Sequence, residues 1–99
     1  MLMAKTALGR WVDVDDWQTQ REDAALRILY GYRVVGGASA EVSAAAFANA
    51  LGLDPAEAVA LGAQLVAQGR AFRGMGAHAY RLSPAGLAEV QSLIGGAGA

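Results

Sequence analysis

Apolar and polar residues follow helical spacing in four segments of this chain, and two short runs before the last helix alternate as strands do. The first helical segment, residues 16–35, repeats apolar side chains at steps of three, four and seven, which predicts one stripe along one helix. Gly36 and Gly37 are expected to end it, because glycine adopts the left-handed cap conformation without a steric clash. The expected stripe consists of Trp17, Ala24, Ile28, Tyr32 and Val35, with Ala25 and Leu29 beside it.

A second, shorter helix is predicted over residues 43–51. Ser43 is placed to cap it, since a serine oxygen accepts from the free amides of a first turn. Just before it, Glu41 and Val42 are expected to make a single short strand. The apolar face of this helix is predicted to hold Ala46, Phe47, Ala50 and Leu51.

The third helix follows a tight turn that begins at Gly52 and is predicted to run from Asp54 to Gly69. Asp54 caps it, and Pro55 takes the first position, where the missing N–H costs nothing. Its buried face is expected to comprise Ala58, Leu61, Gly62 and Leu65. Gly62 is unfavourable inside a helix by roughly 1 kcal/mol relative to alanine, which the close approach of a neighbouring helix would explain.

The next two runs, residues 70–74 and 77–82, read as two strands joined by Gly74-Met75-Gly76. Alternation places Phe72 and Arg73 on opposite faces, and it separates Arg81 from Tyr80 and Leu82. A last helix is predicted to start at Ser83 and Pro84. Its apolar stripe is expected to be Leu87, Val90, Leu93 and Ile94.

The chain of 99 residues has room for one domain, and the expected class is mainly α with a small β-hairpin. Residues 1–15 are predicted to form an arm, 16–94 the domain and 95–99 a flexible tail. A composition of 55% hydrophobic and 17% charged residues disfavours disorder. No apolar run approaches the ~18 residues of a membrane span, and no signal peptide is evident, so a cytoplasmic location is expected.

Charge is distributed unevenly along the chain. The net charge of −1 excludes a globally basic nucleic-acid binder but leaves a local basic patch open. Residues 34–69 contain no Lys or Arg, whereas residues 70–81 contain three arginines, the only histidine and no acid.

Side chains for catalysis or metal binding are scarce. The chain has no cysteine and a single histidine, His78, so a metal site lacks its usual ligands. Gly74-Met75-Gly76 lacks the Lys-Ser/Thr that follows a phosphate-binding loop. No catalytic residue, metal site or cofactor is therefore assigned, and the chain is not expected to be an enzyme.

The order helix, turn, helix, hairpin, helix resembles the winged helix-turn-helix domains of small bacterial and archaeal regulators such as the MarR and PadR groups. The similarity covers residues 46–53 for the first helix and turn, 54–70 for the second helix and 80–87 for the exit from the hairpin. The resemblance implies that the third helix faces the major groove of DNA and that the hairpin is a wing. Positions that match the outward face of the third helix are Glu57, Val59, Ala60, Ala63 and Gln64, of which Gln64 alone suits base reading.

Two functions follow from this resemblance and from the residues. The first is a transcriptional regulator that binds double-stranded DNA mainly through its wing, using Arg70, Arg73, Arg81 and His78 on phosphates, with Gln64 on bases. The second is a winged-helix module that binds a protein partner or forms a homodimer. In that case the contact surface is expected to comprise Val59, Ala60, Ala63 and Trp11.

Overall fold

The computed structural model describes the backbone of residues 3–5 and 11–96 and the side chains of residues 18–95. The elements in chain order are β1 (Met3–Lys5), β2 (Trp11–Asp13), α1 (Val14–Gly36), β3 (Val42–Ser43), α2 (Ala44–Leu51), α3 (Pro55–Ala67), β4 (Ala71–Arg73), β5 (Ala79–Leu82) and α4 (Pro84–Gly96). Among the helices of this part of the chain, none is both long enough and apolar enough to cross a membrane.

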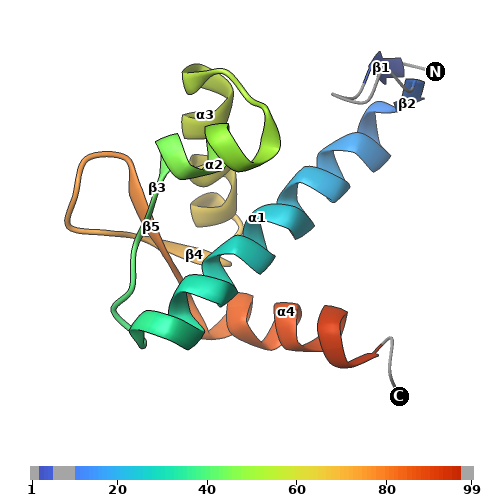
Figure 1. Ribbon diagram of the computed structural model, residues 1–99. Coiled ribbons are helices and arrows are strands. Elements are labelled where there is room, and N and C mark those ends of the chain that lie inside the picture. Colours follow the sequence, from blue (N-terminus) through green and yellow to red (C-terminus); the bar gives the residue numbers. More distant parts are fainter. Residues whose placement is uncertain (1–2, 6–10, 97–99) are drawn as a thin grey trace.

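The described chain is mainly helical with a small three-stranded antiparallel sheet, as the sequence predicts, whereas the strands β1 and β2 were not predicted. The sheet has the order β3-β5-β4, and β1 and β2 form a separate antiparallel pair before α1. Figure 1 shows α2 and α3 together on one side of the three-stranded sheet, α4 on the other side, and α1 running past both. The β4–β5 hairpin projects from this body.

The core lies where α1, α2, α3 and the sheet meet. The rings of Phe47 and Tyr80 stack there with their centroids 6.0 Å apart, and both side chains are buried. The same core contains Leu26, Leu29 and Leu65, and each of these side chains is almost completely shielded from solvent. Burial of large apolar side chains at this one junction is the main force that holds four elements together.

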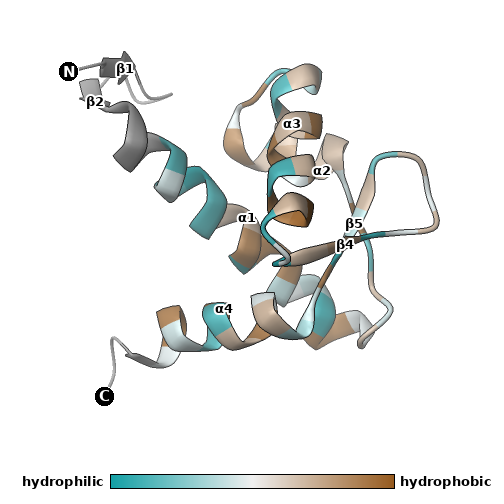
Figure 2. Ribbon diagram, turned by 180° about the vertical axis from the view of Figure 1, so that it is seen from behind, coloured by the Kyte–Doolittle hydropathy of each residue, from teal (hydrophilic) through white to brown (hydrophobic). Residues whose placement is uncertain are grey.

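The buried stripe of α1 differs from the predicted one. Ala25, Leu26 and Leu29 face the core, whereas Tyr32 is 46% exposed and Val35 is 90% exposed. Both sets of residues have helical spacing, so periodicity alone cannot choose between them. Figure 2 shows that hydrophilic residues dominate the early described turns of α1 and that apolar residues appear toward its centre.

Caps fix the ends of α2 and α3 as predicted. The Ser43 hydroxyl accepts from the amide of Ala46 at 3.2 Å, although α2 itself begins one residue later than predicted. Gly52 ends α2 in the left-handed conformation. Asp54 and Glu57 form a reciprocal capping box on α3, with N–H···O distances of 2.8 and 3.3 Å.

The predicted buried face of α3 is confirmed, but the reason for Gly62 is not the predicted one. A methyl group at Gly62 would overlap the ring of Tyr80, which comes from β5 and not from a neighbouring helix. Tyr80 also donates a long hydrogen bond, 3.4 Å, to the carbonyl of Val59. Glycine at this position therefore lets an aromatic ring approach the helix backbone closely.

Smaller differences concern the edges of the other helices. Ala50, predicted on the apolar face of α2, is exposed, and Ile94 at the end of α4 is 49% exposed. Val90 is buried as predicted, with Leu87 and Leu93 half-buried beside it. Of the predicted tail, residues 97–99 lie outside the described residues.

Candidate nucleic-acid interface

The hairpin separates two of the predicted phosphate-binding arginines. In the β4–β5 register Phe72 pairs with Arg81, and Arg73 pairs with Tyr80. Directly paired residues of an antiparallel ladder share one face of the sheet. Arg73 therefore lies on the face of Tyr80, toward α2 and α3, while Arg81 lies on the opposite face.

Arg81 is held against an aromatic ring on that opposite face. Its guanidinium carbon lies 5.4 Å from the centroid of Phe72, and both side chains are exposed. A cation over an aromatic face is attracted by the ring quadrupole without losing its charge. The contact thus positions the Arg81 guanidinium and leaves its hydrogen-bond donors available to a ligand.

Arg70, the third predicted phosphate contact, is engaged inside the protein. Its guanidinium pairs with Glu22 of α1 and, at 2.7 Å, with Glu89 of α4, and its side chain is only 14% exposed. Gln68 accepts from its Nε at 2.8 Å. Arg70 therefore connects α1 and α4 at the start of β4. Most of its hydrogen-bond donors already bind these partners, so few remain for a phosphate.

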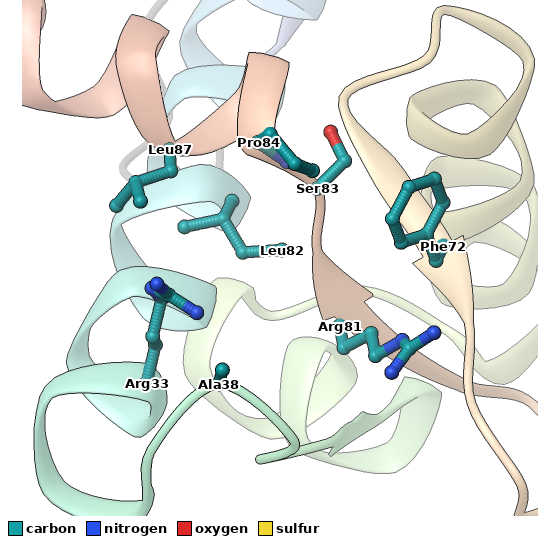
Figure 3. Close-up of a pocket in the computed structure, with 8 residues that line it drawn as sticks. All are labelled: Arg33, Ala38, Phe72, Arg81, Leu82, Ser83, Pro84 and Leu87. Carbon is teal, nitrogen blue, oxygen red and sulfur yellow. The ribbon is translucent and has the colours of Figure 1, made fainter.

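A hollow of about 320 Å³ lies beside Arg81 on the outer face of the hairpin. Figure 3 shows Arg33 on α1 and Arg81 on β5 at two sides of the hollow, with Phe72 on β4 beyond Arg81 and with Leu82 and Leu87 near the beginning of α4. Ala38, Ser83 and Pro84 complete its lining. None of these described lining residues carries a carboxylate. We call this site the Arg33–Arg81 hollow.

The beginning of α4 adds to the positive potential of this hollow. Ser83 accepts from the amide of Gly86 at 3.0 Å and donates to the carbonyl of Gly69 at 2.7 Å, so it caps α4 and ties it to the end of α3. The N-terminus of a helix carries a partial positive charge. Two arginines and this helix end consequently surround the same space.

Arg33 was not among the site residues that the sequence predicted. Its position in the last turn of α1 is visible in the sequence, but its proximity to the hairpin is not. The two arginines line the same hollow because α1 packs along β5. A pattern within a short stretch of sequence cannot indicate such a contact between distant segments.

The outward face of α3 offers few groups that read bases. Gln64 and Ala60 are exposed, while Val59 and Ala63 are half-buried. Glu57 is occupied by the capping box and by an ion pair with Arg21 at 3.5 Å. This face of α3 therefore carries mainly small apolar side chains, and Gln64 supplies its single side-chain amide.

His78 lies on the other side of the hairpin from the Arg33–Arg81 hollow. It is exposed, has a positive φ of 50° and accepts from the amide of Ala44 through its carbonyl at 2.8 Å. Its side chain borders a second hollow of about 390 Å³, which Val59 and Pro55 also line. The structure therefore does not bring His78 together with Arg81.

Glu41 is a further residue that sequence reasoning did not assign to the site. Its carboxylate accepts from the amide of Met75 at 2.7 Å and from that of Gly76 at 3.3 Å. A side chain at Gly74 would collide with it. Glu41 thus fastens the turn of the hairpin to the segment before β3 and fixes the direction in which the hairpin projects.

The side chain of Trp11, which the sequence predicts as a partner contact, lies outside the described side chains. Among the described residues there is no group of three or more His, Cys, Asp or Glu side chains arranged to hold a metal ion.

Comparisons of the chain with models of known protein families, with curated proteins and with solved structures found no match. The function is therefore argued from the geometry of the described residues.

Proposed function

We propose that this chain is a winged helix-turn-helix protein that binds double-stranded DNA and regulates transcription. The order α1-β3-α2-α3-β4-β5-α4 with a β3-β5-β4 sheet is the arrangement expected of such a domain. Since one fold hosts many functions, the proposal needs support from a site as well.

The Arg33–Arg81 hollow is the observation that carries the proposal. Most acidic side chains around the body are already engaged, as with Glu22 and Glu89 on Arg70 and Glu57 on Arg21. Arg33 and Arg81 have no described carboxylate partner. Guanidinium groups with free donors suit phosphate oxygens, which they contact with a rigid, forked geometry.

In the proposed complex the hairpin and the end of α1 contact the sugar-phosphate backbone. Arg33 and Arg81 act on one face of the hairpin and Arg73 on the other, so the hairpin presents cations on both sides. Arg70 is not part of this set, because its ion pairs connect α1 and α4. Phosphate contacts fix position and orientation, whereas sequence is read at base edges.

Sequence discrimination is expected to be modest. Along α3 only Gln64 presents a donor and an acceptor, and Ala60 and Ala63 present methyl groups. A methyl group distinguishes thymine weakly in comparison with a bidentate hydrogen bond. We therefore expect affinity to depend more on salt than on sequence.

The test is the affinity for mixed-sequence duplex DNA, measured by fluorescence anisotropy over a series of salt concentrations. With three arginines on phosphates, the slope of log K against log salt should be about −2.7, at roughly 0.9 per phosphate. Arg33→Gln and Arg81→Gln should each weaken binding about three- to tenfold and reduce the slope by about 0.9.

Arg27→Gln is the matched control, since Arg27 is an exposed arginine of α1 that does not line the hollow. It should leave the affinity within about twofold in samples that sedimentation shows to be monomeric. Binding that is insensitive to salt, or an equal loss in all three variants, would contradict the proposal.

A second function, protein contact without DNA, is favoured by the small apolar side chains on α3. Ala60 is exposed, with Val59 and Ala63 half-buried beside it. Absence of DNA binding at low salt would support this alternative over the first.

A further inference from the structure

Helix α1 has a second apolar face, of which Ile28 packs against the core while the rest extends beyond it. Ile28, Gly31, Tyr32 and Val35 follow one another at steps of three, one and three, which places them on one side of the helix. Tyr32 is 46% exposed and Val35 is 90% exposed. These residues form one wall of a groove of about 620 Å³ whose other wall includes Ala46 and Ala50 of α2. We call it the α1–α2 groove.

Gly31, in the middle of this face, has no explanation within a single copy of the chain. A methyl group at Gly31 would meet no atom within 4 Å, whereas one at Gly62 would meet Tyr80 and one at Gly86 would meet the carbonyl of Arg70. Glycine destabilises a helix interior relative to alanine. A helix backbone from outside that crosses α1 closely at this point would require it.

The charge of the groove indicates what such a helix presents. Arg27 is the only charged residue among the described residues that line it, and none of these described residues forms an ion pair with it. Its favourable partner is a negative charge or the carboxyl end of a helix, whose last carbonyl groups carry a partial negative charge.

A second copy of the chain supplies such an end. If two α1 helices cross antiparallel at Gly31, Arg27 lies four residues before the crossing point and Val35 lies four residues after it. The Arg27 of each copy then reaches the last carbonyl groups of the other α1, whose Arg33 lies on the opposite side of the helix and lines the Arg33–Arg81 hollow instead. The two-fold symmetry makes this contact twice. Tyr32 and Val35 of each copy enter the groove of the other.

We propose that the α1–α2 groove is the surface through which this chain associates with a second copy of itself, with the α1 helices antiparallel across Gly31. The apolar stripe covers about two helical turns, or roughly 12 Å of α1. Such a length buries less than the ~800 Å² per partner of a standard interface. The dimer is accordingly weak and depends on protein concentration. This association does not require DNA binding.

Sedimentation velocity of the full chain without DNA, over a range of protein concentrations, tests the proposal. Val35→Ser is the main variant, and Val34→Ser is its matched control, because Val34 is 65% exposed at the same helix end but does not line the groove. Val35→Ser should raise the dissociation constant about tenfold, while Val34→Ser should change it less than about twofold. Circular dichroism should show both variants folded.

Gly31→Ala tests whether Gly31 serves the contact between two copies of the chain or only the conformation of its own helix. It should raise the melting temperature at concentrations where the chain is monomeric, because alanine favours the helix. It should also weaken self-association, because the added methyl group keeps the two backbones apart. A wild-type chain that stays monomeric at every concentration would overturn the proposal, as would equal effects of Val34→Ser and Val35→Ser. If the groove instead binds a small apolar ligand or a different protein, the wild-type chain would stay monomeric at every concentration.

Discussion

At the scale of single residues, Tyr80 shows how one side chain decides what its neighbours can be. Its ring stacks on Phe47, lies against Gly62 and is almost fully buried. The close contact with α3 is possible only because residue 62 has no side chain. Alternation along the second strand placed Tyr80 and Arg81 on opposite faces, but the sequence did not show which helix Tyr80 would touch.

Gly62→Ala should therefore destabilise the fold, although alanine is the better helix former. Overpacking against a buried ring costs about 1–3 kcal/mol, which outweighs a gain of up to ~1 kcal/mol in helix propensity. Urea unfolding would measure the change. In a Tyr80→Leu background the same substitution should cost less, because the ring is gone. An increase in stability from Gly62→Ala alone would show that Tyr80 moves aside freely.

At the scale of elements, the helix ends are determined by a few residues close in sequence. Ser43, Gly52 and Asp54 act as predicted because a cap satisfies backbone groups within three or four residues. Which face of a helix is buried depends more on contacts with segments that are distant in sequence. The predicted face of α3 is correct, whereas α1 has two adjacent apolar faces, and packing selected the one that contains Leu26 and Leu29.

The cap of α3 gives the stability a specific dependence on pH. The amide of Glu57 donates to Asp54 and lowers the pKa of that carboxyl below its ordinary value of 3.8. A group whose pKa is lower in the folded state contributes stability above the unfolded pKa and loses it as pH falls through the folded pKa. The melting temperature should thus drop as acid protonates Asp54 below about pH 4.

Asp54→Asn is the control for this effect, since asparagine caps a helix but does not titrate in this range. The difference in melting temperature between wild type and Asp54→Asn should shrink between pH 5 and pH 2. A difference that does not change with pH would show that the Asp54 charge has no part in the cap.

At the scale of the whole molecule, Arg70 joins elements that are distant in sequence. It lies at the start of β4 and pairs with Glu22 of α1 and Glu89 of α4, so the hairpin is tied to two helices. The sequence showed three arginines in an acid-free segment, and that pattern predicted that all three contact phosphates. The fold gives them three different environments, because among the described residues acidic side chains form ion pairs with Arg70 but not with Arg73 or Arg81.

Replacement of Arg70 should consequently affect stability far more than replacement of Arg73. Arg70→Met leaves Glu22, which is 13% exposed at its side chain, without its cation and should cost about 1–3 kcal/mol. Arg73→Met, at an exposed position, should stay within about 0.5 kcal/mol of wild type. Chemical denaturation of both variants would measure this, and the double variant Arg70→Met/Glu22→Met should recover part of the loss. Equal effects of the two single substitutions would contradict the structural role of Arg70.

The sequence by itself determined the class of fold, the succession of helices and strands from α1 onward, the caps of α2 and α3 and the buried face of α3. These features depend on steric and hydrogen-bonding preferences that act over a few residues, so a local pattern contains them. Only the tertiary structure decided which apolar face of α1 enters the core, why residue 62 is glycine and which arginines stay available. Arg33 and Arg81 illustrate the reason: their proximity follows from the packing of α1 along β5, and packing satisfies contacts across the whole chain at once.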